Sequence, residues 1–353
     1  METPIKIGLI GFGRIGRNIF RLGYRNPNYR FVAISDLGKP EALHYLLMRD
    51  SVHGAMKDEA VLEGNFLKIN GQNVRLLSGG TPGTIPWDIF DVDVVIDATG
   101  RFRRRLDLQK HLEAGAKRVF VTTPPYDPID RIVIRGVNED EINVEDQLIS
   151  TTSSTTQVLA LMLKILDTHF GVKRSMMTTV HAYTSDQPLA DAVRSDLRRS
   201  RSAVENIIPN QTDAPMLVEQ LIPKFKGKLA GIAFNVPVPD GSCVDLTTEL
   251  ENMPTVEEAN QVVKVAAREE LAGIVGYTED PIVSSDIIGS SESMVYDAKA
   301  TMITAGKLLK TICWYDNGWG FSKRILETID AYHKLDAEAN KGPAKGSGNE
   351  VQS

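Results

Sequence analysis

Residues 149–166, ISTTSSTTQVLALMLKIL, join a run of small hydroxyl side chains to a run of apolar ones. From residue 158 onward the apolar residues recur at helical spacing, which predicts a buried helix. Ser153 or Ser154 is the expected N-cap, because a serine oxygen can accept a free backbone N–H at a helix start. A helix start also concentrates N–H donors and positive dipole, which suits an anion or an activated nucleophile. The stretch therefore predicts either a simple capped helix or a reactive site at its first turn.

The residues before this helix have the pattern of a nucleotide-binding half. An apolar strand at residues 5–10 runs into Gly11, Gly13 and Gly16, a Gly-x-Gly-x-x-Gly turn that opens a helix. Such glycines allow a tight turn and the close approach of a pyrophosphate. The second strand ends at Asp36, 25 positions past Gly11 (36 − 11), near the spacing at which an acid binds a ribose hydroxyl. We predict a dinucleotide site; the alternative is an ordinary tight turn between strand and helix.

Two further apolar runs, residues 92–96 and 118–122, are typical of parallel strands covered on both faces. Thr122 ends the second run, at the sheet edge where open α/β sheets bind ligands. Between the runs, four basic residues cluster where a helix is expected to begin: Arg101, Arg103, Arg104 and Arg105. This cluster is interpreted either as a solvated face or as an anion site.

After the central helix the pattern changes to α+β. Strands are expected at residues 176–180, 231–238, 243–250, 281–284, 293–297 and 309–315, and a last amphipathic helix at 321–334. His181 follows the first of these strands. A lone histidine is more often structural than catalytic, but neighbouring hydroxyls, Arg201 and the upstream dinucleotide half favour a catalytic role. Residues 337–353, rich in Gly, Lys, Ala and Ser, are expected to form a disordered tail.

Composition narrows the class of protein. A length of 353 residues suggests two domains, and 42% apolar with 24% charged residues is typical of a globular protein with an ample core. We expect no membrane span, no secretory signal and, from a net charge of −6, no nucleic-acid partner. Two cysteines, Cys243 and Cys313, make neither a disulfide framework nor a metal cluster. A cytoplasmic protein without a metal is expected.

The chain resembles the glyceraldehyde-3-phosphate dehydrogenase family over roughly residues 3 to 335. The matching stretches are KIGLIGFGRIGRNIFR (6–21), DSVHG (50–54), HLEAGAKRV (111–119), VHAYT (180–184), DLRRSRSAVENIIP (196–209), KGKLAGIAF (226–234), VSSD (283–286) and WYDNGWGFS (314–322). Their length and number exclude a chance match.

The resemblance implies a fold and a cofactor. It implies a Rossmann-type, doubly wound NAD-binding domain at residues 1–152 and an α+β catalytic domain with a largely antiparallel sheet at 153–317. A C-terminal helix, 318–336, would return to the first domain. NAD would be the cofactor, the substrate a small molecule that can carry phosphate, and the assembly a homotetramer.

The resemblance also assigns residues by position. Ser154 stands at the nucleophile position and His181 matches the catalytic base. Cofactor contacts match Gly11, Gly13, Arg14, Ile15, Gly16, Asp36, Thr122 and Asn317, the last of which would hold the nicotinamide amide. Substrate or phosphate contacts match Ser153, Thr155, Thr184, Arg201, Thr212, Asp213 and Asn235.

Several of these positions depart from the family pattern. The family signature Ser-Cys-Thr-Thr-Asn is Ser-Ser-Thr-Thr-Gln at residues 153–157, so a serine replaces the nucleophilic cysteine. Asn235 replaces an arginine that the family uses for both anion sites, and Asp213 replaces a glycine that helps to hold phosphate. An arginine on the adenosine side is Gly80. Because these losses agree with one another, they indicate a paralogue that no longer performs thioester phosphorolysis.

Three functions follow as hypotheses. The first is an NAD-dependent oxidoreductase on this scaffold with an altered aldehyde or alcohol substrate. The second is a non-catalytic NAD-binding partner or regulatory subunit, against which the presence of His181, Thr184, Arg201 and Asn317 argues. The third is the ordinary glycolytic enzyme, which requires Ser154 to suffice as nucleophile.

Overall fold

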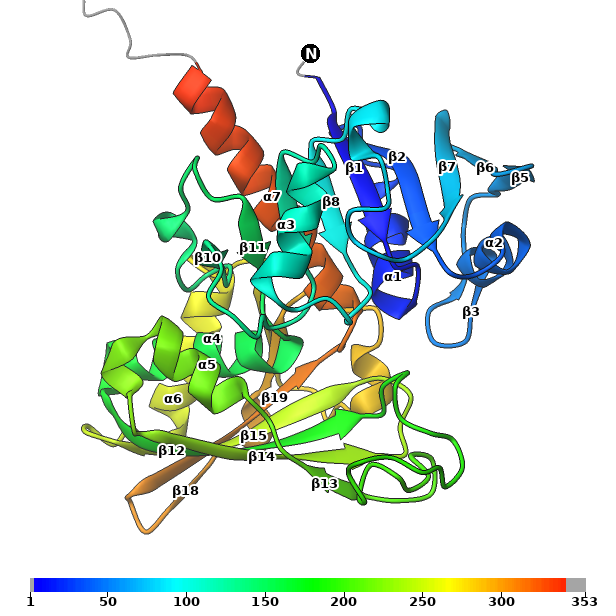
Figure 1. Cartoon of the computed structure of the whole chain (residues 1–353). Coiled ribbons are helices and arrows are strands. Elements are labelled where there is room, and N and C mark those ends of the chain that lie inside the picture. The colour runs from blue at the N-terminus through cyan, green and yellow to red at the C-terminus, as the bar shows by residue number, and fades with distance from the viewer. Residues whose placement is uncertain (1–2, 341–353) are drawn as a thin grey trace, which may run out of the picture.

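The computed structural model describes residues 3–340, which form two sheets with separate hydrophobic cores (Figure 1). The first sheet is mostly parallel and carries helices on both faces. The second is largely antiparallel and carries three helices on one face, α4 (Ser154–Phe170), α5 (Ala214–Leu221) and α6 (Val256–Arg268). The predicted fold class, a doubly wound Rossmann-type half with an α+β half, is therefore confirmed.

The first sheet has nine strands in the order β10-β11-β9-β8-β1-β2-β7-β6-β5. Their bounds, in that order, are Arg131–Ile132, Leu148–Ser150, Arg118–Val121, Val94–Asp97, Ile5–Ile10, Tyr29–Asp36, Gln72–Ser78, Phe66–Ile69 and Val61–Glu63. Neighbours from β10 to β7 pair in parallel, and β6 and β5 extend the edge antiparallel. Strands β8 and β9 are buried along their whole length, as continuous apolar runs predict for a sheet covered on both faces.

Four helices pack on this sheet: α1 (Arg14–Gly23), α2 (Pro40–Met48), α3 (Arg105–Glu113) and α7 (Trp319–Asn340). The apolar residues of α1, α2 and α7 share one core, and those of α3 lie in another with the buried Trp87. Helix α7 is fixed to the sheet by an ion pair of 2.6 Å between Arg118 and Asp336, and Tyr332 donates a hydrogen bond of 2.8 Å to Asp146. The last helix thus returns to the first sheet (Figure 1).

The second sheet has the order β13-β14-β12-β15-β19-β17-β16, with β18 paired to β19. The bounds in that order are Ile208–Asn210, Leu229–Val236, Val172–Ala182, Ser242–Leu250, Leu308–Tyr315, Met294–Asp297 and Val275–Thr278, with β18 at Met302–Thr304. Two pairs, β12 with β14 and β16 with β17, are parallel, and the others are antiparallel. Its helices are α4 (Ser154–Phe170), α5 (Ala214–Leu221) and α6 (Val256–Arg268), and α4 is buried along most of its length.

The remaining elements are short. Strands β3 (Arg49–Asp50) and β4 (Gly54–Ala55) form a two-stranded ribbon, and 3-10 helices occur at Trp87–Phe90, Glu139–Glu141, Pro223–Phe225, Ser284–Ile287 and Ala298–Ala300. Within residues 3–340, no helix combines the length and apolar character that a membrane span requires.

Two sequence predictions were wrong in detail. The strand expected at residues 281–284 does not form, because the Asp286 carboxylate accepts the Val283 N–H at 2.8 Å and closes a 3-10 turn instead. The last helix continues to Asn340 rather than ending at 334, so the expected disordered tail cannot begin at 337. The rest of that predicted tail, 341–353, lies outside the described residues.

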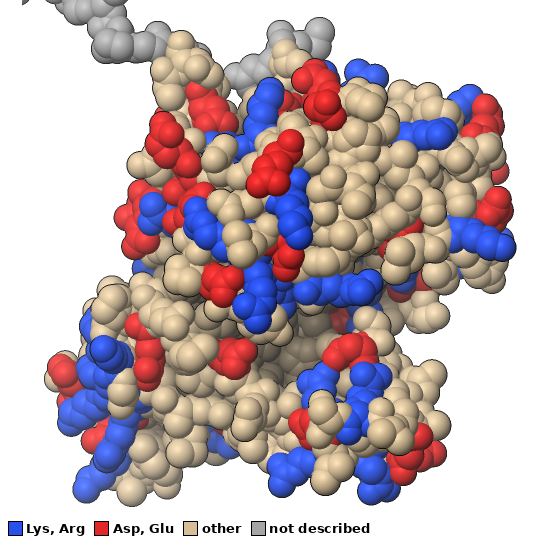
Figure 2. All heavy atoms as spheres, viewed as in Figure 1, with Lys and Arg blue, Asp and Glu red and all other residues tan. Residues whose placement is uncertain are grey.

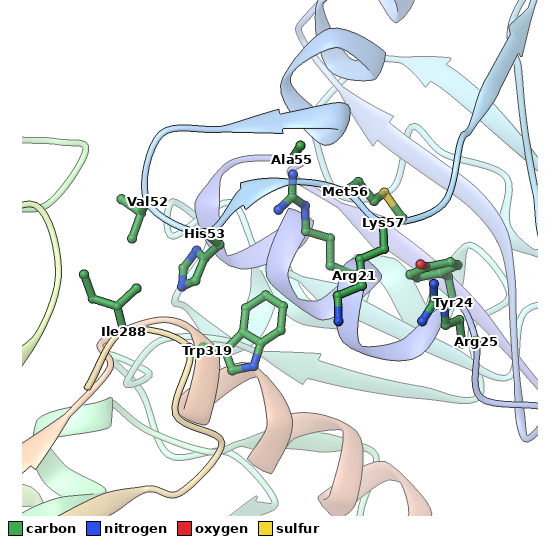
Figure 3. A pocket seen from close by; sticks show the side chains of 11 residues that line it. Arg21, Tyr24, Arg25, Val52, His53, Ala55, Met56, Lys57, Ile288 and Trp319 are labelled. Atoms are coloured by element: carbon green, nitrogen blue, oxygen red, sulfur yellow. The ribbon is translucent and has the colours of Figure 1, made fainter. Parts of the chain in front are cut away.

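A buried ion cluster joins the two halves. His53, between β3 and β4, donates from Nε2 to Asp316 at 3.0 Å, and Asp240 lies 3.7 Å from the same nitrogen. Asp316 and Asp240 belong to the second half, whereas Asp50, 3.6 Å from His53 Nδ1, belongs to the first. The His53 ring also faces Trp319 at a centroid distance of 4.9 Å (Figure 3). The cluster therefore links β3–β4, the end of β19 and the start of α7.

The charge of His53 is set by this environment. Burial by itself lowers the pKa of His53, but the hydrogen bond to Asp316 and the nearby Asp50 and Asp240 outweigh it and raise the pKa to about 9. The imidazole is therefore protonated at neutral pH, and its positive charge offsets part of the negative charge of the carboxylates. Burial and the nearby Asp316 raise the pKa of Asp240.

We predict that wild-type stability falls between pH 6.5, the ordinary value of the histidine, and about 9, where folded His53 loses its proton. A group whose pKa is raised by folding stabilises the protein fully below its unfolded-state pKa, and this stabilisation is lost above its folded-state pKa. The free energy of unfolding should therefore fall by about 3 kcal/mol, at roughly 1.4 kcal/mol per pKa unit. His53→Gln should lack this slope. Unfolding midpoints in guanidinium chloride, measured at pH 6, 7.5 and 9.5 for both proteins, give this pH dependence of stability. Parallel slopes for both proteins would show that His53 is not the group responsible.

Candidate active site

A cavity of about 260 Å³ lies where the two halves meet, and we call it the catalytic cleft. The first half contributes two lining residues, Arg103 and Pro124, and the second half contributes the rest. These are Ser153, Thr155, Thr179, His181, Thr184, Arg199, Asn210, Gln211, Thr212, Asp213, Ala214, Leu217, Ala233 and Asn235. Figure 2 shows the hollow between the two lobes, with Lys and Arg side chains along its edge. Most predicted substrate residues are thus brought together.

The cleft floor is the start of α4. Ser153 is the N-cap, because its hydroxyl accepts the Thr156 N–H at 3.2 Å, and Ser154 is the first helical residue. The preceding Thr152 has a φ of 61°, a left-handed conformation that a threonine adopts only under constraint from its surroundings. Ser154 is half-buried, and no hydrogen bond of its hydroxyl occurs in the part of the chain that the structure describes. Ser154 therefore lies at the helix N-terminus between Ser153 and Thr155, which line the cleft, but Ser154 itself is not among the lining residues.

His181 stands at the end of β12 with one ring nitrogen already engaged. Nδ1 lies 2.6 Å from the carbonyl oxygen of Ala182, which can only accept, so Nδ1 carries the proton and Nε2 has a free lone pair. Burial lowers the pKa of His181, so the ring is neutral at pH 7. Its edge contacts Tyr315 at a centroid distance of 6.1 Å. A neutral, oriented imidazole of this kind can act as a general base.

Hydroxyl groups form a buried network below His181. The Tyr315 hydroxyl bonds Thr155 at 2.8 Å and Thr179 at 3.0 Å. This network fixes the first turn of α4 against the second sheet. Thr155 therefore lines the cleft while its hydroxyl is engaged with the protein.

The cleft lining includes the neutral amide of Asn235 beside His181 and the carboxylate of Asp213. Asn235 pairs with His181 in register across β14 and β12, and its amide contacts Asn210 at 3.4 Å and the Ala182 carbonyl at 3.5 Å. Asp213 stands at the N-cap of α5 but makes no side-chain cap hydrogen bond. Thr212 precedes it, and both line the cleft.

One predicted substrate contact is placed differently. Arg201, predicted to face the cleft, pairs with Asp191 at 3.0 Å with its side chain 60% exposed, and it is absent from the lining. Arg199, two positions earlier in the same polar loop, lines the cleft instead and pairs with Asp186. The Thr184 hydroxyl also donates to Asp186. Adjacent arginines of an irregular loop cannot be told apart by position alone, and sequence reasoning missed Arg199.

The glycine turn fits a dinucleotide. Gly11 has a φ of 86°, and a Cβ there would lie 2.7 Å from the backbone nitrogen of Thr99. At Gly16 a Cβ would meet the carbonyl oxygen of Gly11 at 2.1 Å, whereas at Gly13 it would meet nothing within 4 Å. The first and third glycines are thus required for packing, and the second leaves open space for a pyrophosphate.

The other predicted cofactor residues lie around that turn. Asp36 ends β2, and its carboxylate accepts the backbone N–H groups of Phe12 at 2.6 Å and Gly38 at 2.8 Å. Arg14 donates to the Pro239 carbonyl at 3.1 Å, and Ile15 is half-buried on α1. Thr122 follows β9, at the carboxyl edge of the sheet.

Asn317 is held from two sides. Its backbone N–H donates to Asp240 at 3.1 Å, and its side-chain oxygen accepts the Ser242 hydroxyl at 2.5 Å. Its Nδ2 is buried and has no partner among the described residues. An oriented amide with a free donor is suited to bind the carboxamide of a nicotinamide.

Two other features have some properties of a binding site. The ligand atoms of His53, Asp240 and Asp316 lie within 4.8 Å of one another, as metal ligands do. His53 binds Asp316, and backbone N–H groups bind Asp316 and Asp240, so these contacts hold the group together as an ion cluster. A larger cavity of about 470 Å³ lies beside His53 and Trp319 (Figure 3), with none of the predicted substrate residues in its lining.

Neither cysteine supplies a thiol to the cleft. Cys243 and Cys313 lie on β15 and β19, and both are buried. Burial raises the pKa of Cys243 to about 11 and that of Cys313 higher still. Such thiols stay protonated and unreactive at neutral pH.

Comparison with known proteins identifies the family. Residues 5–105 match the family model described as "Glyceraldehyde 3-phosphate dehydrogenase, NAD binding domain", and residues 153–317 match "Glyceraldehyde 3-phosphate dehydrogenase, C-terminal domain". The chain is 45% identical over 324 residues to "Glyceraldehyde-3-phosphate dehydrogenase" of Geobacillus stearothermophilus, covering 92% of this chain and 96% of the relative. The protein named "Glyceraldehyde-3-phosphate dehydrogenase 1" in Bacillus subtilis is 44% identical with the same coverage.

These matches agree with the geometry of the glycine turn, and NAD is the cofactor. The chain belongs to the glyceraldehyde-3-phosphate dehydrogenase family of NAD-dependent oxidoreductases.

Proposed function

We propose that this chain is an NAD-dependent aldehyde or alcohol dehydrogenase with an altered substrate and little phosphate-coupled aldehyde oxidation. The observation that carries the proposal is Ser154, a hydroxyl at the helix start where the family signature has a thiol. A thiol with an ordinary pKa near 8.5 is readily ionised by an imidazole and a helix start. A serine hydroxyl is a far weaker acid and needs a strong base at the moment of attack.

The charges of the cleft support the same proposal. Asn235, buried beside His181, leaves that wall without a guanidinium, and Asp213 adds a carboxylate. Both changes disfavour an inorganic phosphate that has to attack an acyl group there. The loss of the thiol and the loss of the phosphate cradle thus act on the same step.

In the mechanism we propose, His181 acts as the base. Its Nε2 accepts the proton of a substrate hydroxyl, either an alcohol or an aldehyde hydrate, while the Ala182 carbonyl stabilises the positive ring through Nδ1. Ser154 donates or accepts a hydrogen bond that orients the substrate. Asn317 would hold the nicotinamide amide, and NAD when bound supplies the hydride acceptor. No covalent acyl group is needed for this sequence.

The rival functions make different demands on these residues. A purely NAD-binding partner has no need of an oriented His181 or of the hydroxyl network under it. The ordinary phosphorylating reaction named for the relatives would require Ser154 to replace the thiol and a phosphate site that functions with Asp213.

We also propose that the chain assembles as a homotetramer in which residues 1–152 and 318–336 form the cofactor unit and 153–317 the catalytic unit. The second sheet exposes apolar side chains that an assembly would cover: Met176 is 65% and Met302 53% exposed. Sedimentation at micromolar concentration measures the assembly, and a stable monomer would contradict this proposal.

We predict that the chain binds NAD more tightly than NADP. Asp36 ends β2 with its carboxylate fixed by two backbone N–H donors, where it can pair with a ribose 2′-hydroxyl and would repel a 2′-phosphate. Calorimetric titration with each cofactor measures the two affinities, and Asp36→Asn should reduce the ratio of NAD affinity to NADP affinity. Equal or tighter binding of NADP by the wild type would show that Asp36 does not read the ribose.

We predict that Ser154→Cys alone does not give brisk oxidation of glyceraldehyde 3-phosphate coupled to inorganic phosphate. Charge-assisted hydrogen bonds to an anion are worth roughly 1.5–3 kcal/mol each. The missing guanidinium and the added carboxylate should therefore lower the affinity for inorganic phosphate by about two to four powers of ten. A restored thiol leaves that deficit in place.

The matched variant is the triple change Ser154→Cys, Asn235→Arg and Asp213→Gly, which should recover far more phosphate-dependent NADH formation than the single change. Initial rates at increasing phosphate concentration separate the two deficits. If Ser154→Cys alone is fast, the chain is an ordinary dehydrogenase with one disabling substitution.

A further inference from the structure

We propose that Arg103, with Arg199 in the lining of the same cleft, forms an oxyanion-binding subsite that selects a substrate ending in a phosphate or carboxylate group. This inference rests on the proposed function, since it names the substrate class of the same cleft. Arg103 belongs to the basic cluster of residues 101–105, and it is the member of that cluster that lines the cleft.

Arg103 is held in place by the protein. Its Nε donates to the Pro124 carbonyl at 2.6 Å and its Nη1 to the Tyr126 hydroxyl at 3.1 Å. The guanidinium carbon lies 4.0 Å from the centroid of the Tyr126 ring, a cation–π contact. The side chain is therefore oriented before any ligand arrives, which lowers the entropy cost of binding.

The charge of Arg103 is not compensated within the described residues. It makes no ion pair there, unlike Arg105, which pairs with Asp130 at 2.6 Å, and its Nη2 has no hydrogen-bond partner there. A guanidinium with a free N–H beside a cavity is the group that binds carboxylate and phosphate best, because its planar fork matches their geometry.

Arg199 supplies the second cation. Its side chain is 29% exposed and lines the cleft from the polar loop, with Nη2 paired to Asp186. Asp186 also accepts the Thr184 hydroxyl, so the loop residues hold one another in place. Because Asp186 compensates Arg199, the cation without an ion pair in the described lining is Arg103, and His181 is neutral.

The subsite therefore differs in place from the cradle whose arginine is replaced. Asn235 lies on β14 beside His181, whereas Arg103 comes from the first half, between β8 and α3. An anionic group bound at Arg103 would leave the other end of a small molecule free to reach His181. In Figure 2, Lys and Arg side chains lie along the upper edge of the hollow, and Asp and Glu side chains also lie beside it.

The cluster provides its own control. Arg101 and Arg104 are exposed and do not line the cleft, although they carry the same charge within two positions of Arg103. A general attraction of anions to a basic surface would depend on all three residues. A built subsite would depend on Arg103 far more than on the other two.

The test is calorimetric titration of the full chain, without NAD, with three non-reacting probes of similar size: glycerol 3-phosphate, glycerate and glycerol. At least one anionic probe should bind about tenfold or more tightly than glycerol, and Arg103→Gln should weaken that probe about 10- to 100-fold. The tighter of the two anionic probes identifies phosphate or carboxylate as the preferred group. Arg103→Lys should retain part of the affinity, because charge remains while the fork is lost.

Arg101→Gln is the matched control and should change the same affinity by no more than about twofold, as for an exposed charge. Unchanged NAD affinity and unfolding midpoint in Arg103→Gln would exclude a folding defect. Equal losses in Arg101→Gln and Arg103→Gln, or no preference for anions over glycerol, would overturn the subsite. Because the probes do not react, anion binding without any turnover would instead count against the proposed function alone.

Discussion

A buried hydrogen bond between His53 and Asp316 connects the two halves of the molecule. Asp316 also accepts the N–H groups of Gly318 at 2.8 Å and Trp319 at 2.5 Å, so the residue that binds His53 also begins α7. The neighbouring Asp240 holds the backbone of Asn317. A single protonated imidazole thus couples the ribbon of the first half, the returning helix and the amide expected to meet the nicotinamide.

The chemistry of the cleft follows from which charges it holds. A constrained turn at Thr152 presents Ser154 at a helix start, and burial keeps His181 neutral, so the site has a base but no thiolate. Such a pair suits proton abstraction better than the formation and phosphorolysis of an acyl enzyme. A neutral amide, that of Asn235, lies beside His181, and the first half contributes Arg103 to the lining. The arrangement agrees with the proposed hydride-transfer site, in which an anionic group would bind at Arg103 rather than beside Asn235.

Sequence patterns predicted the fold well where burial is two-sided or a turn demands glycine, as in the first sheet and at Gly11. They failed where local hydrogen bonds determine the backbone conformation. At residues 281–284 a strand was predicted, but the Asp286 carboxylate accepts the Val283 N–H and a turn forms instead. Helix α6 was missed although Thr255 and Glu258 form a capping box readable from the sequence. The roles of Arg103 and Arg199 could not be assigned from the sequence, because the side of an irregular loop that faces a cavity depends on tertiary packing.

The central claim is that this cleft transfers hydride from a small substrate without phosphorolysis. The most direct measurement is NADH formation over a panel of aldehydes and alcohols that end in phosphate, carboxylate or a neutral group, each with and without inorganic phosphate. The account predicts saturable turnover of at least one anionic member, independent of phosphate and abolished by His181→Ala. Absence of NADH with every member, in a chain that still binds NAD, would contradict it and leave a non-catalytic NAD-binding protein.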